Sequence, residues 1–380
     1  MKDRFSLPEG LHYLNAAYMT PLSKRAEAAG REALERARDP TSIEPADFFA
    51  IPDRVRRAFG RIVNGDPERV AIVPAASYGI ATAARNTPVE AGQNVVVLHE
   101  QFPSHVYAWR RVAGEAGAEL RTVAPPAEPD SRGEGWNARL LEAIDRDTAA
   151  VAVPHVHWTD GTLFDLEAVG ERAREAGAAL VIDGTQSVGA LPFDVGRIRP
   201  DALVCAGYKW LTGPYGIGVA WFGPRYDGGV PLEENWINRR GSEEFAGLVD
   251  YEEAYQPGAV RYDAGEKSSF VLGPILAAAL EELLEWGIAS IRSHCREVLA
   301  ESLAAAREMG YRVEVPEWRA AHLVGVRIPD RVALDRLREA LDERDVVVSL
   351  RGDAIRVSPH LYNDTNDAAA LEEALRSAAG

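Results

Sequence analysis

The feature that most constrains this 380-residue chain is a short apolar run that ends on an aspartate and is followed by a lone lysine. Residues 178–182 are apolar and lead directly into Asp183, and Lys209 follows 26 residues later. No other charged residue lies between Ala202 and Ala220, and the whole chain has only four lysines, because arginine supplies nearly all of its positive charge. A lysine in so apolar and glycine-rich a segment indicates a task that a guanidinium cannot perform.

The aspartate and the lysine have complementary chemistry. A desolvated lysine can lose its proton and form a Schiff base with a carbonyl group. An aspartate at the C-terminal end of a buried parallel strand points into the crevice where α/β proteins bind ligands. Pyridoxal phosphate needs both groups, a lysine for covalent attachment and a carboxylate beside its pyridinium nitrogen. The alternative is a strand-end aspartate with an unrelated lysine.

Apolar strands alternate with amphipathic helices along most of the chain, and this spacing is typical of a mainly parallel α/β sheet. Beyond this region, two long helices, expected at about 270–286 and 288–309, lead into a smaller α+β region at the C-terminal end. The apolar strands expected in the large sheet are residues 70–73, 94–98, 119–123, 149–154 and 178–182.

The order of these features resembles the class V aminotransferase family, which includes cysteine desulfurases, kynureninases and isopenicillin N epimerase-like enzymes. The resemblance rests on Asp183-x-x-Gln186 after a strand and on Tyr208–Trp210 before a Gly/Pro turn, and it extends from Tyr13 to Asn363. It implies a fold-type I pyridoxal-phosphate enzyme with a mainly parallel seven-stranded sheet and a smaller α+β C-terminal domain. The expected divisions are an N-terminal substrate-side segment (1–20), a large cofactor-binding domain (21–260) and a small C-terminal domain (261–380).

The segment Pro74–Gly79 follows the first of these strands and opens a helix. Small residues followed by a hydroxyl at a helix N-terminus can form a seat for a phosphate, because free backbone N–H groups and the positive end of the helix dipole converge there. We therefore expect Ala76 and Ser77 to bind the cofactor phosphate. The alternative is that Ser77 is simply the N-cap of the helix.

Further cofactor contacts follow from the resemblance. Phe102 matches the aromatic residue that stacks on the cofactor ring in kynureninase-like members, and a core phenylalanine is the alternative. Gln186 lies where many family members place histidine or glutamine, so it is expected to donate to the cofactor's 3′-oxygen. Tyr208 is expected to contact the cofactor beside Lys209.

The resemblance also implies a set of substrate contacts. Arg356 matches the arginine that binds the α-carboxylate of the substrate, and bidentate pairing of this kind would orient an amino acid for reaction. A surface arginine on a strand is the alternative. Asn15 belongs to an entry segment expected near the substrate, and Trp158 or Thr159 lies in a loop that contacts both the cofactor and the substrate in the family.

A homodimer with its active sites at the interface is likewise implied. Trp236 matches a tryptophan that reaches the phosphate of the neighbouring subunit in kynureninases. Arg261–Gly265 matches a segment that crosses the interface, but Glu266 or Lys267 falls where family members commonly carry a phosphate-binding threonine or asparagine.

The formal charge of −16 argues against nucleic acid or an anionic membrane surface as a partner, so an anionic ligand must be held by local donors. Two cysteines, Cys205 and Cys295, give no disulfide framework, and the N-terminal sequence lacks the apolar core of a signal peptide, so a cytoplasmic location is expected. His155 and His157 could share a strand face as metal ligands, but no third ligand has suitable spacing, and no metal is expected.

Several reactions stay open for an enzyme that uses Lys209, Asp183 and Arg356 on an α-amino acid. Transamination is preferred because it needs no further specialised group, and the alternatives are a lyase or hydrolase (kynureninase-like) and an amino-acid epimerase. Desulfurase chemistry is disfavoured, because only Gly352–Ile355 separates Arg351 from Arg356 where those enzymes insert a loop with a nucleophilic cysteine. A cofactor-free binding protein on the same scaffold is an alternative from another class.

Overall fold

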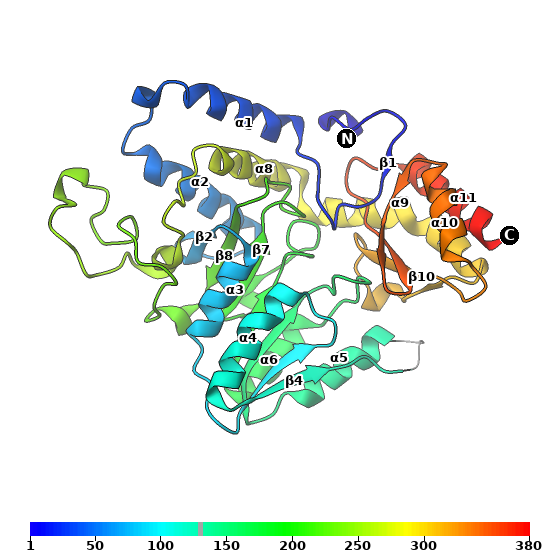
Figure 1. Ribbon diagram of the computed structural model, residues 1–380, viewed down its shortest axis with the longest axis horizontal. Coiled ribbons are helices and arrows are strands. Elements are labelled where there is room, and N and C mark those ends of the chain that lie inside the picture. The colour runs from blue at the N-terminus through cyan, green and yellow to red at the C-terminus, as the bar shows by residue number, and fades with distance from the viewer. Residues whose placement is uncertain (128–131) are drawn as a thin grey trace.

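The computed structural model describes residues 1–127 and 132–380. Figure 1 shows a large sheet flanked by helices and a smaller unit beside it, with the long helix α9 (Ile288–Glu308) running from one to the other. The other α-helices are α1 (Lys24–Arg36), α2 (Asp47–Ile62), α3 (Ala76–Arg85), α4 (Pro103–Ala116), α5 (Arg132–Ala143), α6 (Leu166–Ala176), α7 (Val195–Ile198), α8 (Leu272–Trp286), α10 (Leu334–Asp342) and α11 (Thr365–Ala379).

The large sheet has seven strands in the order β2-β8-β7-β6-β5-β3-β4. Strand β8 is antiparallel to both of its neighbours, and the remaining pairs are parallel. The mainly parallel seven-stranded sheet expected from the sequence is therefore confirmed. The strands are β2 (Val70–Val73), β3 (Asn94–Leu98), β4 (Glu119–Val123), β5 (Thr148–Pro154), β6 (Ala179–Asp183), β7 (Ala202–Ala206) and β8 (Gly218–Phe222).

Both faces of this sheet are covered, which explains why its central strands are apolar without interruption. Alternate residues of one strand belong to different buried clusters: Leu180 and Ile182 of β6 pack on one side, and Val181 packs on the other. This is the two-residue period of a strand, in which successive side chains point to opposite faces. The sandwiched sheet fixes the positions of the strand ends, where Asp183 lies.

The smaller unit is built on a four-stranded antiparallel sheet in the order β12-β13-β10-β9. The N-terminal segment joins this unit, because β1 (His12–Tyr13) pairs in parallel with β11 (Val346–Val347) and Leu14 enters its buried cluster. The strands of the small sheet are β9 (Arg312–Val313), β10 (Val324–Arg327), β12 (Ser349–Arg351) and β13 (Ala354–Val357).

Helix α8 belongs to the large unit by its packing, although the sequence places residues 261–380 together in the small domain. Its buried side chains, Leu276 and Leu283 among them, share the cluster that covers one face of the large sheet. The change of core occurs inside α9, where Cys295 still contacts that cluster and Val298 already contacts the other. No helix in the described residues is long and apolar enough to cross a membrane.

Candidate active site

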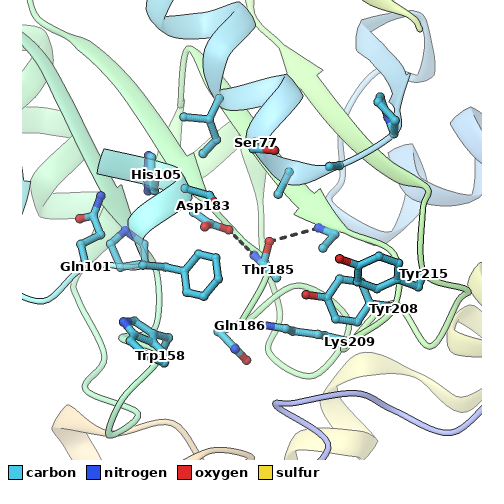
Figure 2. Close-up of a pocket in the computed structure, with 18 of the residues that line it drawn as sticks. Ser77, Gln101, His105, Trp158, Asp183, Thr185, Gln186, Tyr208, Lys209 and Tyr215 are labelled. Carbon is cyan, nitrogen blue, oxygen red and sulfur yellow. Dashed lines mark hydrogen bonds between the residues drawn. The ribbon is translucent and has the colours of Figure 1, made fainter. Parts of the chain in front are cut away.

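A cavity of about 220 Å³ lies at the C-terminal ends of β5, β6 and β7, against the N-terminus of α3. Figure 2 shows how side chains from these strand ends and from the start of α4 converge on it. This is the location at which open α/β sheets bind ligands. The predicted residues that line the cavity are Ala76, Ser77, Phe102, Trp158, Asp183, Gln186, Tyr208 and Lys209.

Lys209 is buried in the turn that follows β7, with 7% of its surface exposed. Its Nζ lies 5.4 Å from the ring centroid of Phe102 and 5.6 Å from that of Tyr208, and no carboxylate in the described chain forms an ion pair with it. Burial lowers the pKa of Lys209 to about 8, and the charge of Arg356 acts in the same direction while that of Asp183 opposes it. The amine is thus poised to lose its proton near neutral pH.

Asp183 ends β6, and its carboxylate faces the cavity (Figure 2). Its Oδ1 accepts a hydrogen bond from the backbone N–H of Thr185 at 2.9 Å, and the Thr185 hydroxyl in turn accepts one from the backbone N–H of Ala206 at 3.1 Å. These two bonds tie the ends of β6 and β7 together. The Asp183 carboxylate is therefore held in place, and no cation of the described chain forms an ion pair with it.

The N-terminus of α3 offers free donors on the opposite side of the cavity. Ala75 is its N-cap and has no side chain able to accept a hydrogen bond, and Ser77 is the second helical residue. The alternative reading of Ser77 as a capping serine is therefore wrong. Within the described residues the backbone N–H groups of Ala76 and Ser77 have no acceptor, so they are available to an anion at the positive end of the helix dipole.

Phe102 and Trp158 form an aromatic wall on the other side of the cavity. Their rings meet edge to face at a centroid distance of 5.5 Å, and the Trp158 indole N–H donates to the carbonyl oxygen of Glu100 at 2.7 Å. Phe102 is therefore not a core residue, the alternative that the sequence left open. It lies at the N-cap of α4, where its ring faces Lys209 across the cavity.

The orientation of the Gln186 amide is fixed by its neighbours. Its Oε1 accepts from the Trp210 indole N–H at 2.9 Å, and its Nε2 donates to the carbonyl oxygen of Ala17 at 3.1 Å. Because an indole N–H can only donate, the amide oxygen must face Trp210, and one N–H of the amide remains available. Donation from that N–H to the cofactor's 3′-oxygen stays a prediction.

Three predicted substrate residues lie outside the lining of the cavity. The Thr159 hydroxyl is bonded to His157 Nδ1 at 2.7 Å, and Asn15 Oδ1 accepts from the Ser349 hydroxyl at 2.8 Å. Arg356 is adjacent, because its Nη1 donates to the carbonyl oxygen of Trp158 at 2.8 Å. Arg356, from β13 of the small unit, therefore meets the cavity lining at Trp158, and the substrate contacts of these three residues stay predictions.

The structure also brings in residues that sequence reasoning missed. Thr185 and His105 both line the cavity, as does Tyr215, which is 69% exposed at its edge. Burial lowers the pKa of His105 to about 4, with Asp183 acting in the opposite direction, so the imidazole is neutral at pH 7. The sequence does contain one indication that His105 belongs to the site, since it lies three residues after Phe102, at the start of the same helix.

Other predicted contacts lie elsewhere in this chain. Trp236 is 39% exposed and packs edge to face on Phe48 and Phe245, outside the cavity, so its predicted contact with a neighbouring subunit stays a prediction. Lys267 is buried with its Nζ 2.8 Å from Asp263 Oδ2, which commits its charge to a structural ion pair.

Both ring nitrogens of His157 are used by protein atoms, since Nδ1 meets the hydroxyl of Thr159 and Nε2 meets the carbonyl oxygen of His99 at 3.1 Å. His157 is thus occupied as a structural residue rather than open to a metal. Across residues 1–127 and 132–380, no cluster of three His, Cys, Asp or Glu side chains is arranged to hold a metal ion.

The residues present fit pyridoxal phosphate. A buried primary amine without an ion pair (Lys209) suits covalent attachment of an aldehyde, and a strand-end carboxylate (Asp183) suits a pyridinium nitrogen. The unpaired amides of Ala76 and Ser77 suit a phosphate. All these groups border the same cavity.

Comparisons with known proteins agree with this chemistry. The family model described as Aminotransferase class-V matches residues 42–371. The chain is 27% identical over 329 residues to the uncharacterized aminotransferase YcbU of Bacillus subtilis (strain 168), covering 85% of this chain and 80% of that protein. It is 27% identical over 372 residues to isopenicillin N epimerase of Streptomyces clavuligerus, covering 92% of each.

A solved structure of a C-DES variant, with glycine covalently linked to its PLP cofactor, has the same fold as this chain. The two superpose with a TM-score of 0.85 over 99% of this chain and 98% of the other, at 18% sequence identity. At this level of identity the similarity establishes the fold alone.

Proposed function

The chain belongs to the class V aminotransferase family, a family of pyridoxal-phosphate enzymes, and we propose on that premise that it is an aminotransferase acting on an α-amino acid. One observation carries the proposal: among the residues that the structure describes, Lys209 is buried without an ion pair, in the cavity that also holds Asp183 and the unpaired amides of α3. Few other functions would justify the cost of burying an unpaired lysine.

Bound pyridoxal phosphate supplies an electron sink for the electrons of a broken Cα bond. Lys209 Nζ would hold the cofactor covalently and then move a proton at the substrate Cα, for which its lowered pKa is suited. Asp183 would keep a proton on the ring nitrogen, Phe102 would cover one face of the ring, and Arg356 would hold the α-carboxylate.

Transamination is favoured because these groups suffice for it. In transamination the proton removed from the substrate Cα is returned at a second carbon. This step requires only a mobile base, and Lys209 is the amine that lines the cavity. Epimerisation and the loss of a β- or γ-substituent share the first proton transfer and are the competing outcomes. A cysteine nucleophile has no support, because Cys205 and Cys295 are both fully buried and burial raises the pKa of both thiols.

The test begins with the visible spectrum of the purified protein, with and without added pyridoxal phosphate. A yellow band that borohydride bleaches, with the label on Lys209, is expected. Lys209→Ala should abolish turnover and labelling, whereas Lys24→Ala, an exposed lysine of α1, should retain both. Incubation with amino acids, with and without a keto-acid acceptor, then identifies the reaction.

Keto acid formed over many turnovers only with an acceptor supports transamination, because without one the cofactor can take up a single amino group per site. Many turnovers to a keto acid or alanine without an acceptor indicate elimination or hydrolysis. Racemised substrate with no keto acid indicates epimerisation. A colourless protein that cannot be reconstituted would refute the enzyme assignment and favour a binding protein on the same scaffold.

We further propose that the protein works as a cytoplasmic homodimer whose interface borders the active site. Large apolar side chains are exposed on the irregular segment between β8 and α8 and at the cavity edge, including Tyr251 at 92%, Trp236 and Tyr215. Exposed apolar groups of this kind mark association surfaces. Analytical ultracentrifugation of the wild type and of Tyr251→Ser tests this proposal, and a monomeric wild type would contradict it.

A further inference from the structure

Two arginines share one face of the hairpin that closes the substrate side of the site. Strands β12 and β13 pair with Ser349 opposite Arg356 and Arg351 opposite Ala354. Residues directly opposite each other in an antiparallel pair lie on the same face, as do residues two apart along one strand. Arg351 and Arg356 are therefore diagonal neighbours on the face that contacts Trp158.

Both guanidinium groups reach Trp158. Arg356 is 1% exposed, and its Nη1 donates to the Trp158 carbonyl oxygen, while the Arg351 Cζ lies 5.4 Å from the centroid of the Trp158 ring. Because Trp158 lines the cavity, both cations lie directly beside the cavity wall. Both charges also act on Lys209, as they contribute to the lowering of its pKa.

Neither arginine has a carboxylate partner in the described residues. Their Nε atoms are buried without any hydrogen bond, and Arg351 Nη1 donates only to the backbone oxygen of Leu350 at 2.6 Å. The acidic residue at the hairpin turn, Asp353, is paired instead with Arg327 at 2.6 Å. The pair is thus left with donors that no group in residues 1–127 and 132–380 uses.

Placing a partly buried guanidinium (Arg351) beside a fully buried one (Arg356) is unfavourable unless an anion compensates their charges. Several other shielded arginines of the described chain have carboxylate partners: Arg56 contacts Asp263, and Arg132 and Arg327 share Asp160. The α-carboxylate of an amino acid would neutralise one guanidinium, Arg356. Arg351 would keep unused donors beside it, and these donors suit a second anionic group.

We propose that the substrate is an α-amino acid whose side chain ends in a carboxylate, with the α-carboxylate on Arg356 and the side-chain carboxylate on Arg351. This inference rests on the proposed function for the identity of the reacting amine. It assigns to Arg351 the selection of the substrate class, and Trp158 spaces the two carboxylate sites.

The test compares ligands that differ only in the second charge. The holoenzyme is first verified by its yellow band, and calorimetry then measures binding of glutarate and of its monoamide. Glutarate is expected to bind roughly tenfold to a hundredfold more tightly, because a hydrogen bond to a charged group is worth about 1.5–3 kcal/mol. Arg351→Gln should remove this preference, Arg351→Lys should restore part of it, and Arg336→Gln, an exposed arginine of α10, should keep it.

Turnover supplies a second readout: L-glutamate should exceed L-glutamine in kcat/KM for the wild type but not for Arg351→Gln. Equal affinity of the wild-type holoenzyme for glutarate and its monoamide would overturn the inference while leaving the proposed function intact. So would an Arg351→Gln protein that keeps the full preference. A protein without a yellow band would instead count against the proposed function, and the binding comparison would still report on the arginine pair.

Discussion

The ionisation of Lys209 can be tested without knowledge of the substrate. Burial and the charge of Arg356 place its pKa at about 8 instead of 10.5. At pH 7.5 about a quarter of the amine is then neutral, against roughly one part in a thousand for an ordinary lysine, a difference of about 200-fold in nucleophile concentration. Covalent capture of pyridoxal phosphate by the apoprotein should therefore be fast at neutral pH.

The assay follows the rate of capture by absorbance between pH 6 and pH 10.5, with borohydride trapping and peptide mapping to assign the label. The rate should rise with a midpoint near pH 8. Arg356→Gln removes a charge that disfavours the ammonium ion, so its midpoint should move to higher pH. A wild-type midpoint at pH 10 or above, or an unchanged midpoint in Arg356→Gln, would refute the electrostatic reasoning.

Three further predictions concern stability. Because the pKa of Lys209 is lower in the folded than in the unfolded chain, its charge destabilises the fold below pH 8, and this effect fades as pH rises to 10.5. Lys209→Met should therefore stabilise the apoprotein at pH 7 by up to about 3 kcal/mol. Calorimetric scans should show that this gain is lost above pH 10.5. Arg56→Met removes one of the two cations that pair with the fully buried Asp263 and leaves Lys267 as its partner, so it should cost about 1.5–3 kcal/mol in urea denaturation. Gly161→Ala would bring Cβ within 1.9 Å of a backbone oxygen and should cost at least about 1–3 kcal/mol, more than Gly92→Ala, which has a similar positive φ but open space.

The core of the fold could be predicted because its signal is local. The apolar run at 178–182 was expected to end on Asp183, and β6 spans Ala179–Asp183. Strand direction was less accessible from periodicity, which is the same for parallel and antiparallel strands. The antiparallel direction of β8 is explained by its connection to β7. Only residues 207–217 separate the two strands, and this segment is short for a crossover to a parallel neighbour.

The assignment of α8 was harder to predict. This helix follows the irregular segment after β8, so its sequence position suggests the start of a new domain. Its apolar face packs instead against α1 and α2 in the core of the large unit, with Leu276 and Leu280 in the same cluster as Phe59. An apolar face gives no information about which neighbour will cover it.

In the candidate site, too, residues with an unusual local sequence could be predicted, whereas residues that act through tertiary contacts could not. Lys209 and Asp183 could be identified because their residue types and surroundings are unusual in the sequence itself. Thr185 acts through its backbone N–H and through a hydroxyl that accepts from another strand, so it leaves no motif. Arg356 meets the site through the carbonyl oxygen of Trp158, a contact between residues 198 positions apart that no spacing rule anticipates.

The cations of the site connect substrate binding to the basicity of Lys209. The charges of Arg356 and Arg351 lower the pKa of this amine while they are uncompensated, which favours the neutral form that captures an aldehyde. Carboxylates bound to the two arginines would cancel that influence, and the amine released in the reaction would then hold a proton more strongly. In this way a substrate with two carboxylates would make Lys209 a stronger base at the step in which it removes the proton from Cα, whereas a substrate with one carboxylate would leave the charge of Arg351 opposing that step.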